Sequence, residues 1–351
     1  MLPSGVYFES FDQEAGYLRT WPQRLWFVGF LILLLVMPLM LGDYILGVLA
    51  VLGVSIIAVL GLQITVGMAG QINLGQSAFV GVGAFMAASL AANSPLPFWL
   101  IIPIGGLIAG LSSILFALPA LRVKGFYLAL TTLAAQIIFP IVVIRLPNSW
   151  FGGSAGMSVG APEIFGLTLD SPAELYYVAI VVMLLAGAFA FNLQRSRVGR
   201  AFQAIRDNDT AAGVMGINLF KYKIMAFFAG AFLAGVAGAL YAYYVRYVTA
   251  EEFTLWMSVW YIGMLIVGGL GSPLGAILGA IFLTILQEVT HGMGGVLMEL
   301  LPNTSGGVVF ASTNIILGAA IVLMLIFEPH GLVHRWNMIK AAYRIWPYSH
   351  N

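Results

Sequence analysis

Residues 44–64 read YILGVLAVLGVSIIAVLGLQI and contain no acidic or basic side chain. A transmembrane helix needs about 20 predominantly apolar residues to cross the hydrocarbon core of a bilayer. This stretch therefore predicts a membrane-spanning helix, and the same pattern recurs along the chain. We predict ten such segments: 25–42, 44–64, 66–92, 97–121, 125–146, 174–193, 223–247, 255–270, 274–291 and 311–327.

The composition of the whole chain favours the same fold class. Of 351 residues, 61% are hydrophobic and only 8% are charged, whereas a soluble domain has about 25% charged residues. We therefore predict an all-α, polytopic transmembrane helical bundle. The absence of cysteine excludes disulfides, thiolate metal sites and cysteine nucleophiles. The net charge of +1 gives no reason to expect a nucleic-acid partner.

The positions of lysine and arginine predict how the chain is oriented, because these residues favour the cytoplasmic side of a membrane. With the N-terminus inside and ten crossings, thirteen of the fifteen basic residues fall inside, and only Arg145 and Arg246 fall outside. We therefore predict that both termini are cytoplasmic. The expected parts are a cytoplasmic leader (1–24), a permease domain (25–327) with a periplasmic loop (147–173) and a cytoplasmic loop (194–222), and a cytoplasmic interfacial tail (328–351).

The predicted cytoplasmic loop contains the run RSRVGRAFQAIRDNDTAAGVMGINLFKYK at residues 195–223. Residues 200–215 have a helix-forming composition, and Gly216 is well placed to end a helix. At 100° per residue, one apolar stripe would contain Phe202, Ile205 and Ala212. Such a helix could lie on anionic lipid or could dock into a groove on an ATPase. The chain has no G-x-x-x-x-G-K-[ST] motif, so any nucleotide that drives it must bind to another chain.

Several motifs with specific spacing resemble the branched-chain amino-acid permease family of ABC importers, in its M-type (LivM-like) subunit. Together they cover most of residues 60–290. The motifs are GLQITVGMAGQINLGQSAFVGVGAF (61–85), LRVKGFYLALTTLA (121–134), GRAFQAIRDNDTAAGVMGIN (199–218), AGAFLAGVAGALYA (229–242) and VGGLGSPLGAILGA (267–280).

The cytoplasmic loop is similar to the Glu-Ala-Ala-x-x-x-Gly loop of importer permeases, with Thr210 in place of Glu and without the Ile-x-Leu-Pro ending. The resemblance implies that this loop couples the permease to an ATPase. The residues expected to do so are Gly199, Arg200, Phe202, Ile205, Arg206, Asp207, Ala211, Ala212 and Gly216. The outer loop departs from the family, because FGGSAG at 151–156 replaces a Thr-Gly-Gly-x-x-Gly turn.

The resemblance also implies the partners and the substrate. A homologous H-type permease would complete a heterodimer, two ABC ATPase subunits would hold ATP-Mg, and a periplasmic substrate-binding protein would deliver branched-chain or other small neutral amino acids. The expected location is the bacterial inner (plasma) membrane. The chain would have no cofactor, no metal and no enzymatic site of its own. A urea or short-amide importer of the same wider family is the nearest alternative, and a passive channel or secondary carrier is a further one.

The stretch from Gly61 to Phe85 is too rich in glycine and amides for a helix that faces lipid. Glycine-interrupted helices often line a transport path, because unwound backbone can bind a solute. The same residues could instead join helices by hydrogen bonds. As candidate pathway residues we predict Gln63, Gly70, Gln71, Asn73, Gly75, Gln76 and Ser77.

Small residues that recur every four positions predict close helix packing. This interpretation applies to Gly230, Gly238, Gly271, Gly275 and Gly279. The polar residues of two predicted spans are interpreted as structural rather than substrate-binding, namely Thr131, Thr132, Gln136, Thr284, Gln287 and Glu288. Glu288 would be the exception if it is buried, although its place near the outer end of its span also allows plain solvation.

Overall fold

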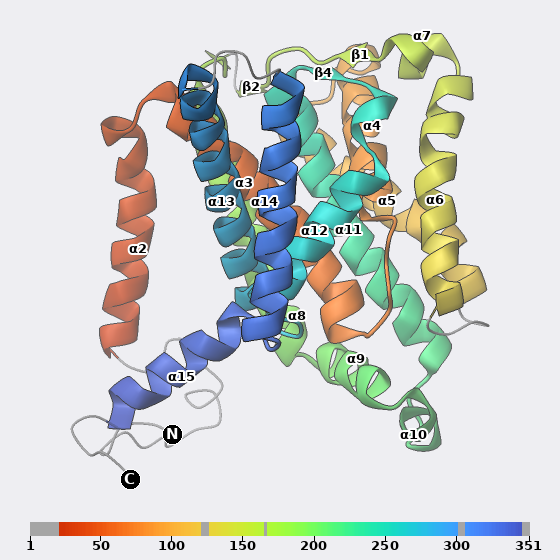
Figure 1. Cartoon of the computed structure of the whole chain (residues 1–351). Coiled ribbons are helices and arrows are strands. Elements are labelled where there is room, and N and C mark those ends of the chain that lie inside the picture. Colours follow the sequence, from red (N-terminus) through yellow and green to blue (C-terminus); the bar gives the residue numbers. More distant parts are fainter. Residues whose placement is uncertain (1–20, 121–125, 165–166, 301–305, 346–351) are drawn as a thin grey trace.

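The computed structural model describes residues 21–120, 126–164, 167–300 and 306–345. The predicted leader 1–24 therefore lies almost entirely outside the described residues. Figure 1 shows a bundle of long helices with short elements at both ends. The elements that form the bundle are α2 (Trp21–Met40), α3 (Asp43–Leu62), its π-helical continuation η1 (Gln63–Met68), α4 (Gln76–Asn93), α5 (Phe98–Ala120), α6 (Phe126–Arg145), α8 (Pro172–Arg195), α11 (Leu219–Val245), α12 (Leu255–Gly268), α13 (Pro273–Leu300) and α14 (Gly306–Phe327). Of these, α4 and α12 are shorter than most of the others.

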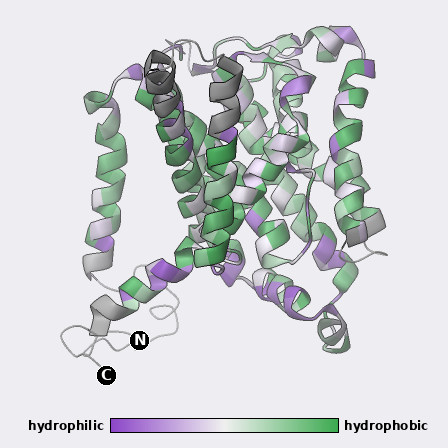
Figure 2. Cartoon of the chain, in the orientation of Figure 1, coloured by the Kyte–Doolittle hydropathy of each residue, from purple (hydrophilic) through white to green (hydrophobic). Residues whose placement is uncertain are grey.

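The short elements lie at the two ends of the bundle (Figure 1). At one end, β1 (Met157–Ser158) pairs antiparallel with β4 (Tyr247–Val248), and β2 (Glu163–Ile164) pairs with β3 (Leu167–Thr168). The same end carries α7 (Asn148–Phe151), η2 (Gly153–Ala155) and η3 (Ala250–Glu252). The other end carries α9 (Arg197–Asp207), α10 (Asp209–Val214) and α15 (Leu332–Ile345). Figure 2 shows that apolar residues predominate along the long helices and that polar residues gather on α9 and on the first part of α15.

The expected all-α membrane bundle is confirmed, whereas the expected ten spans are not. Among the described residues, 6 helices are long and apolar enough to cross a membrane, or up to 7 if the bent pair formed by α14 and α15 counts as one span. The predicted segment 255–270 contains α12, which has only 14 residues. The predicted segment 66–92 contains the end of η1, a non-helical stretch and α4.

Helix α11 lies at the centre of the bundle and packs against α3, α4 and α5. The backbones approach so closely that a Cβ atom added at Gly238 would collide with the carbonyl oxygen of Val80. A Cβ atom at Gly230 would lie 2.7 Å from the carbonyl oxygen of Gly61. Dispersion contacts between such closely packed backbones contribute to helix association in lipid, where the hydrophobic effect gives no driving force.

A second close approach joins α12 to α13. A Cβ atom at Gly279 would collide with the carbonyl oxygen of Met264, and one at Gly275 with that of Gly269. Gly271 does not take part in this contact as a helical residue, because it lies between the predicted spans 255–270 and 274–291 and α13 begins only at Pro273. Gly271 lies in the turn before the helix with a φ of 89°, a conformation that favours glycine.

Helix α2 lies at the edge of the bundle (Figure 1) and contacts α8 next to a proline of α2. Pro38 has no N–H group to donate to the carbonyl of Leu34, four residues earlier. The hydroxyl of Tyr176 donates to that carbonyl at 2.9 Å, and the neighbouring Tyr177 hydroxyl donates to Leu35 O at 3.0 Å. Since a lone carbonyl is costly in lipid, this bond helps to explain how a proline is accommodated within α2.

We expect Gly238→Ala to lower the melting temperature of the detergent-purified protein, because overpacking a tight contact costs about 1–3 kcal/mol. Gly187→Ala in α8 is the matched control, since no atom lies within 4 Å of its added Cβ and alanine favours a helix by up to about 1 kcal/mol over glycine. Fluorescence-detected size-exclusion chromatography after heating measures both variants. A Gly238→Ala protein at least as stable as Gly187→Ala would contradict this packing assignment.

Candidate functional site

Two short helices begin inside the bundle and run towards opposite ends. Helix α4 extends to α7 and β1, whereas α12 extends to α15 (Figure 1). Their N-terminal ends meet, because the Ser77 hydroxyl in α4 donates to the carbonyl of Thr254, the N-cap of α12, at 2.7 Å. A non-helical stretch precedes each of the two helices. The first backbone N–H groups of both helices therefore have no hydrogen-bond partner within their own helix.

Gln136 from α6 binds both helix N-termini. Its side-chain oxygen accepts from the backbone N–H of Ala78 at 3.0 Å and from the Ser258 hydroxyl at 3.1 Å. Its side-chain nitrogen donates to Phe253 O at 2.6 Å. The Ser258 oxygen in turn accepts from the N–H of Ser77 at 2.9 Å. We call these five residues the central polar cluster: Ser77, Ala78, Gln136, Phe253 and Ser258. The side chains of Ser77, Gln136 and Ser258 are buried.

The non-helical stretch before α4 is also bonded to the protein. The hydroxyl of Thr132 accepts from Leu74 N at 3.0 Å. The side chain of Asn73 accepts from Gly75 N and donates to the side-chain oxygen of Gln76, both at 3.0 Å. The amide nitrogen of Gln76 reaches back to Ala58 O in α3 at 2.7 Å. These amides therefore act as bonds between segments in the present conformation.

This geometry bears on the pathway predicted along 63–77. A Cβ atom at Gly75 would lie 2.6 Å from Thr132 O, so this glycine serves a close contact with α6. Two of the seven predicted pathway residues, Gly70 and Gln71, line a cavity of about 360 Å³ beside α9. The amide-rich break is positioned mainly to hold helices together, because its polar groups have partners within the chain.

A larger cavity of about 660 Å³ opens near the end of the bundle that carries β1 and β4. Its polar lining comes from α3, α11, α13 and the segment before α8, and comprises Asp43, Tyr44, Asp170, Arg246 and Glu288 together with Thr284 and Gln287. Arg246 pairs with Asp170 at 3.1 Å. The Tyr44 hydroxyl donates to Glu288 Oε2 at 2.7 Å. We call this space the outer cavity; it offers both an acidic and a basic side chain.

The rest of the outer cavity is aromatic and apolar. Trp260, Tyr261 and Met264 contribute from α12, and Tyr244 contributes from α11. A cavity with apolar walls and a few charged groups is the usual form of a small-molecule site, for which volumes of about 300–1,000 Å³ are typical. This cavity can therefore hold a small solute with one apolar part and charges of both signs.

Sequence reasoning assigned three lining residues of this cavity, Thr284, Gln287 and Glu288, to structural roles. Their spacing places them on one face of α13, and a polar face on an otherwise apolar helix was the available signal. Tyr44 and Trp260 gave no signal, because aromatic residues near membrane interfaces are common in any span.

The loop that we predict to be cytoplasmic forms two helices, α9 and α10, rather than the single helix predicted for 200–215. Asn208 has extended backbone (φ −160°, ψ 105°) and its side-chain oxygen accepts from Ala211 N at 3.0 Å, so it ends α9 and caps α10. Gly216 ends α10 with a φ of 85°. The bonds Ile217 N to Ala212 O at 3.0 Å and Gly216 N to Gly213 O at 3.1 Å form a Schellman motif.

The apolar stripe predicted to dock with a partner is covered by the chain itself. Phe202 is 0% exposed and Ile205 and Ala212 are each 4% exposed. The ring of Phe202 packs edge-on against Tyr222 in α11. The large apolar residues of the loop that are exposed are instead Val214 (84%), Met215 (82%) and, at the start of α11, Phe220 (56%). The stripe anchors α9 and α10 to the bundle, and the end of α10 presents the free apolar surface.

Comparison with known proteins gives a consistent result. The profile of the family described as branched-chain amino acid transport system / permease component matches residues 44–326. The high-affinity branched-chain amino acid transport system permease protein LivM of Escherichia coli K12 is 30% identical over 279 residues, which cover 73% of this chain and 62% of that protein. The protein of the same name from Salmonella typhimurium is 29% identical over the same shares.

More distant relatives have related names. The probable branched-chain amino acid transport permease protein LivM of Methanocaldococcus jannaschii is 25% identical over 72% of this chain and 69% of its own length. The autoinducer 2 import system permease protein LsrC of an Enterobacter strain is 29% identical over 50% of this chain and 55% of its own length. The chain thus spans 62% of the length of the first two relatives. No solved structure matches it.

We expect Gln136→Leu to reduce the yield and melting temperature of the protein strongly. The substitution leaves Ala78 N, Ser258 Oγ and Phe253 O without the bonds that Gln136 makes, and each buried unsatisfied group costs about 1–3 kcal/mol. Ser112→Ala in α5 is the control, because that hydroxyl donates only within its own helix. Equal thermal stability of the two variants would show that the central polar cluster is dispensable.

Proposed function

Because the chain belongs to the family of branched-chain amino acid transport system permease components, we propose that it is the membrane-spanning subunit of an ATP-driven importer of branched-chain amino acids. The observation that carries the proposal is the outer cavity. Glu288 and Asp43 provide negative charge for a substrate ammonium group, and Arg246 provides positive charge for a carboxylate. An aliphatic side chain would contact Trp260 and Met264.

The charged lining favours an amino acid over urea or a short amide. A neutral amide gains little from a carboxylate and a guanidinium that must both lose water on binding. A zwitterion compensates both groups at once, because charge-assisted hydrogen bonds are about twice as strong as neutral ones. Competition between these substrates is therefore the sharpest test of the assignment.

The proposed orientation places α9 and α10 in the cytoplasm and opens the outer cavity to the periplasm, in the inner membrane of a bacterium. The distribution of lysine and arginine supports it. In this orientation ten crossings result if the stretch from Ala69 to Asn93 and the stretch from Arg246 to Gly268 each cross as extended chain plus a short helix. Both termini are then cytoplasmic.

In the proposed import cycle, partner chains supply the energy. Two ABC ATPase subunits hold ATP-Mg, a periplasmic binding protein delivers the substrate, and an H-type permease completes the membrane heterodimer. Closure of the ATPases moves α9 and α10, whose buried stripe is attached to the bundle. The path then changes from outward-facing to inward-facing. Exposed Val214 and Met215 are the proposed ATPase contact.

We expect Thr284→Trp to reduce uptake of labelled leucine by at least about ten-fold, because an indole would fill the space that the substrate must enter. The next residue of α13 provides the control, since Ile285 is exposed on the outside of the bundle and Ile285→Trp leaves the outer cavity open. Uptake is measured in cells that lack other leucine importers, with isoleucine, valine, alanine and urea as competitors.

Two outcomes would overturn this assignment. Unchanged leucine uptake by a well-expressed Thr284→Trp variant would remove the outer cavity from the path. Loss of urea uptake without any loss of leucine uptake would keep the permease architecture and replace the substrate.

We expect Met215→Asp to weaken co-purification of the ATPase subunits, because losing a central apolar anchor of an interface costs at least about 2 kcal/mol, or about 30-fold in affinity. Thr210→Glu is the matched control: it adds a negative charge to the same helix, in its first turn, where the helix dipole favours acidic residues. Stoichiometric co-purification with Met215→Asp would refute the proposed contact.

A further inference from the structure

Arg206 joins the cytoplasmic helix α9 to the broken membrane helix. Its Nη1 atom donates to the carbonyl oxygen of Gly67 in η1 at 2.8 Å. The guanidinium also lies 3.4 Å from the carboxylate of Asp207. Because carbonyl groups at the C-terminal end of a helix carry partial negative charge, the end of η1 attracts this arginine.

Two glycines with positive φ leave room for the arginine. A Cβ atom at Gly70 (φ 66°) would come within 2.8 Å of Arg206 Cγ. A Cβ atom at Gly271 (φ 89°) would come within 2.7 Å of Arg206 Nη1. The side chain thus lies between the end of η1 and the turn that joins α12 to α13.

Two glutamines hold the same turn. The side-chain nitrogen of Gln194, at the end of α8, donates to Gly271 O at 2.7 Å. When the Gln63 amide is oriented to satisfy its neighbours, its side-chain oxygen accepts from the backbone N–H groups of Gly271 and Ser272 at 2.6 and 2.5 Å. Segments far apart in the sequence therefore close together around Arg206 on the inner side of the bundle.

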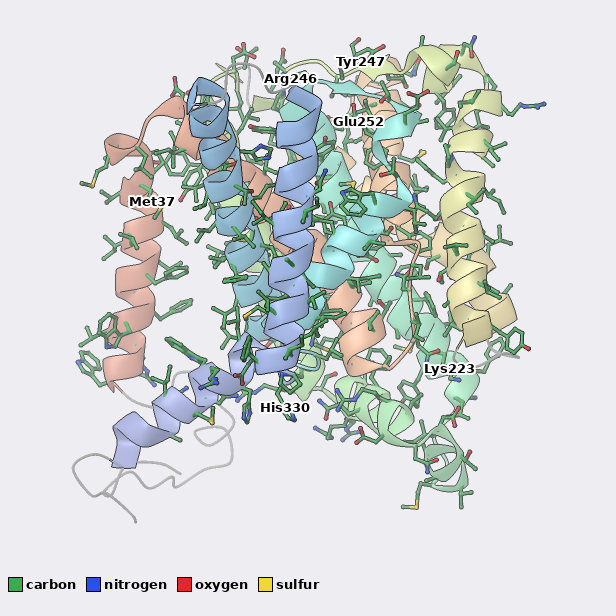
Figure 3. All side chains as sticks on the ribbon, in the orientation of Figure 1. Met37, Lys223, Arg246, Tyr247, Glu252 and His330 are labelled. Carbon is green, nitrogen blue, oxygen red and sulfur yellow. The ribbon has the colours of Figure 1, made fainter. Side chains whose placement is uncertain are left out.

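A second cavity, of about 360 Å³, ends at this closure, and we call it the inner cavity. It is lined by Gly70, Gln71, Arg206 and Lys223 among others. Figure 3 shows Lys223 at one end of the bundle and Arg246, which lines the outer cavity, at the other. Behind the closure Ala69 is 1% exposed.

We propose that Arg206 is the gating residue of the inner closure: it holds η1 against the turn before α13 until movement of α9 withdraws it and opens the path to the inner cavity. The inference rests on the proposed function for the direction of transport. The physical link is direct, since Arg206 belongs to α9, the helix that a docked partner would move. Its bond to Gly67 O is the contact that such a movement would break.

Cysteine labelling tests the gate, because the natural chain contains no cysteine. Ala69→Cys places a thiol behind the closure, and Thr210→Cys provides an exposed reference on α10. The full chain is expressed with its partners, and inside-out membrane vesicles are treated with a membrane-impermeant maleimide without ATP. We expect Arg206→Met to accelerate labelling at position 69 by about ten-fold, a change of about 1.4 kcal/mol in the closed–open equilibrium, and to leave labelling at position 210 unchanged.

Arg200→Met is the matched control, because it removes an arginine of the same helix that donates to Arg195 O at the end of α8 rather than to η1. An unchanged labelling rate at position 69 in Arg206→Met, or an equal acceleration in Arg200→Met, would overturn the proposal. If Arg206→Met does not accumulate, Gly271→Ala replaces it, since the added methyl group displaces Nη1. Gly271→Ala must then accelerate labelling, and failure to do so refutes the gate.

The labelling experiment separates the two proposals. Accelerated labelling together with no leucine uptake by the unmodified importer would retain the gate and reject the substrate. Normal leucine uptake with unchanged labelling would retain the importer and reject Arg206 as its gating residue.

Discussion

The structure depends on one constraint: inside a bilayer every backbone N–H and C=O group must find its partner within the protein. Two short helices that begin inside the bundle place the heaviest demand on that constraint, because helix N-termini leave N–H groups unpaired. Gln136 and Ser258 satisfy these groups from neighbouring helices. The same principle explains why the Tyr176 hydroxyl lies on the carbonyl that Pro38 leaves free.

The polar residues of the bundle are of two kinds, according to whether they serve to bond the backbone at the helix breaks or also face a cavity. The amides between Gln63 and Ser77 are engaged with the chain itself and give the broken helix a defined shape. The charged residues at the end of the bundle that carries β1 and β4, among them Glu288 and Arg246, also have partners in the chain but in addition line open space. A polar residue in a span is thus a candidate for substrate contact only where the structure leaves it facing a cavity, and chemical type alone does not distinguish the two.

In helices α9 and α10, some residues attach the helix to the bundle and others are exposed to solvent. The buried stripe of Phe202 and Ile205 fixes α9 to the bundle, so a force applied to the exposed end of α10 reaches the membrane segments. Arg206, on a neighbouring face of α9, connects that helix to η1. The apolar face of α9 therefore serves to attach the helix to the bundle, and its buried side chains are not available to another protein in this conformation.

The sequence by itself determined the membrane bundle, its family, the helical character of the loop that contains α9 and α10, and the glycine that ends α10, because these depend on composition and on patterns within a few residues. It did not determine which polar residues face a cavity, that Gly271 serves a turn rather than a helix contact, or that α9 buries its apolar stripe. Only the tertiary structure decided these points. Partners such as Ser77 and Ser258 lie 181 residues apart. In addition, a membrane helix is apolar on every side, so its periodicity does not separate the face that meets lipid from the face that meets protein.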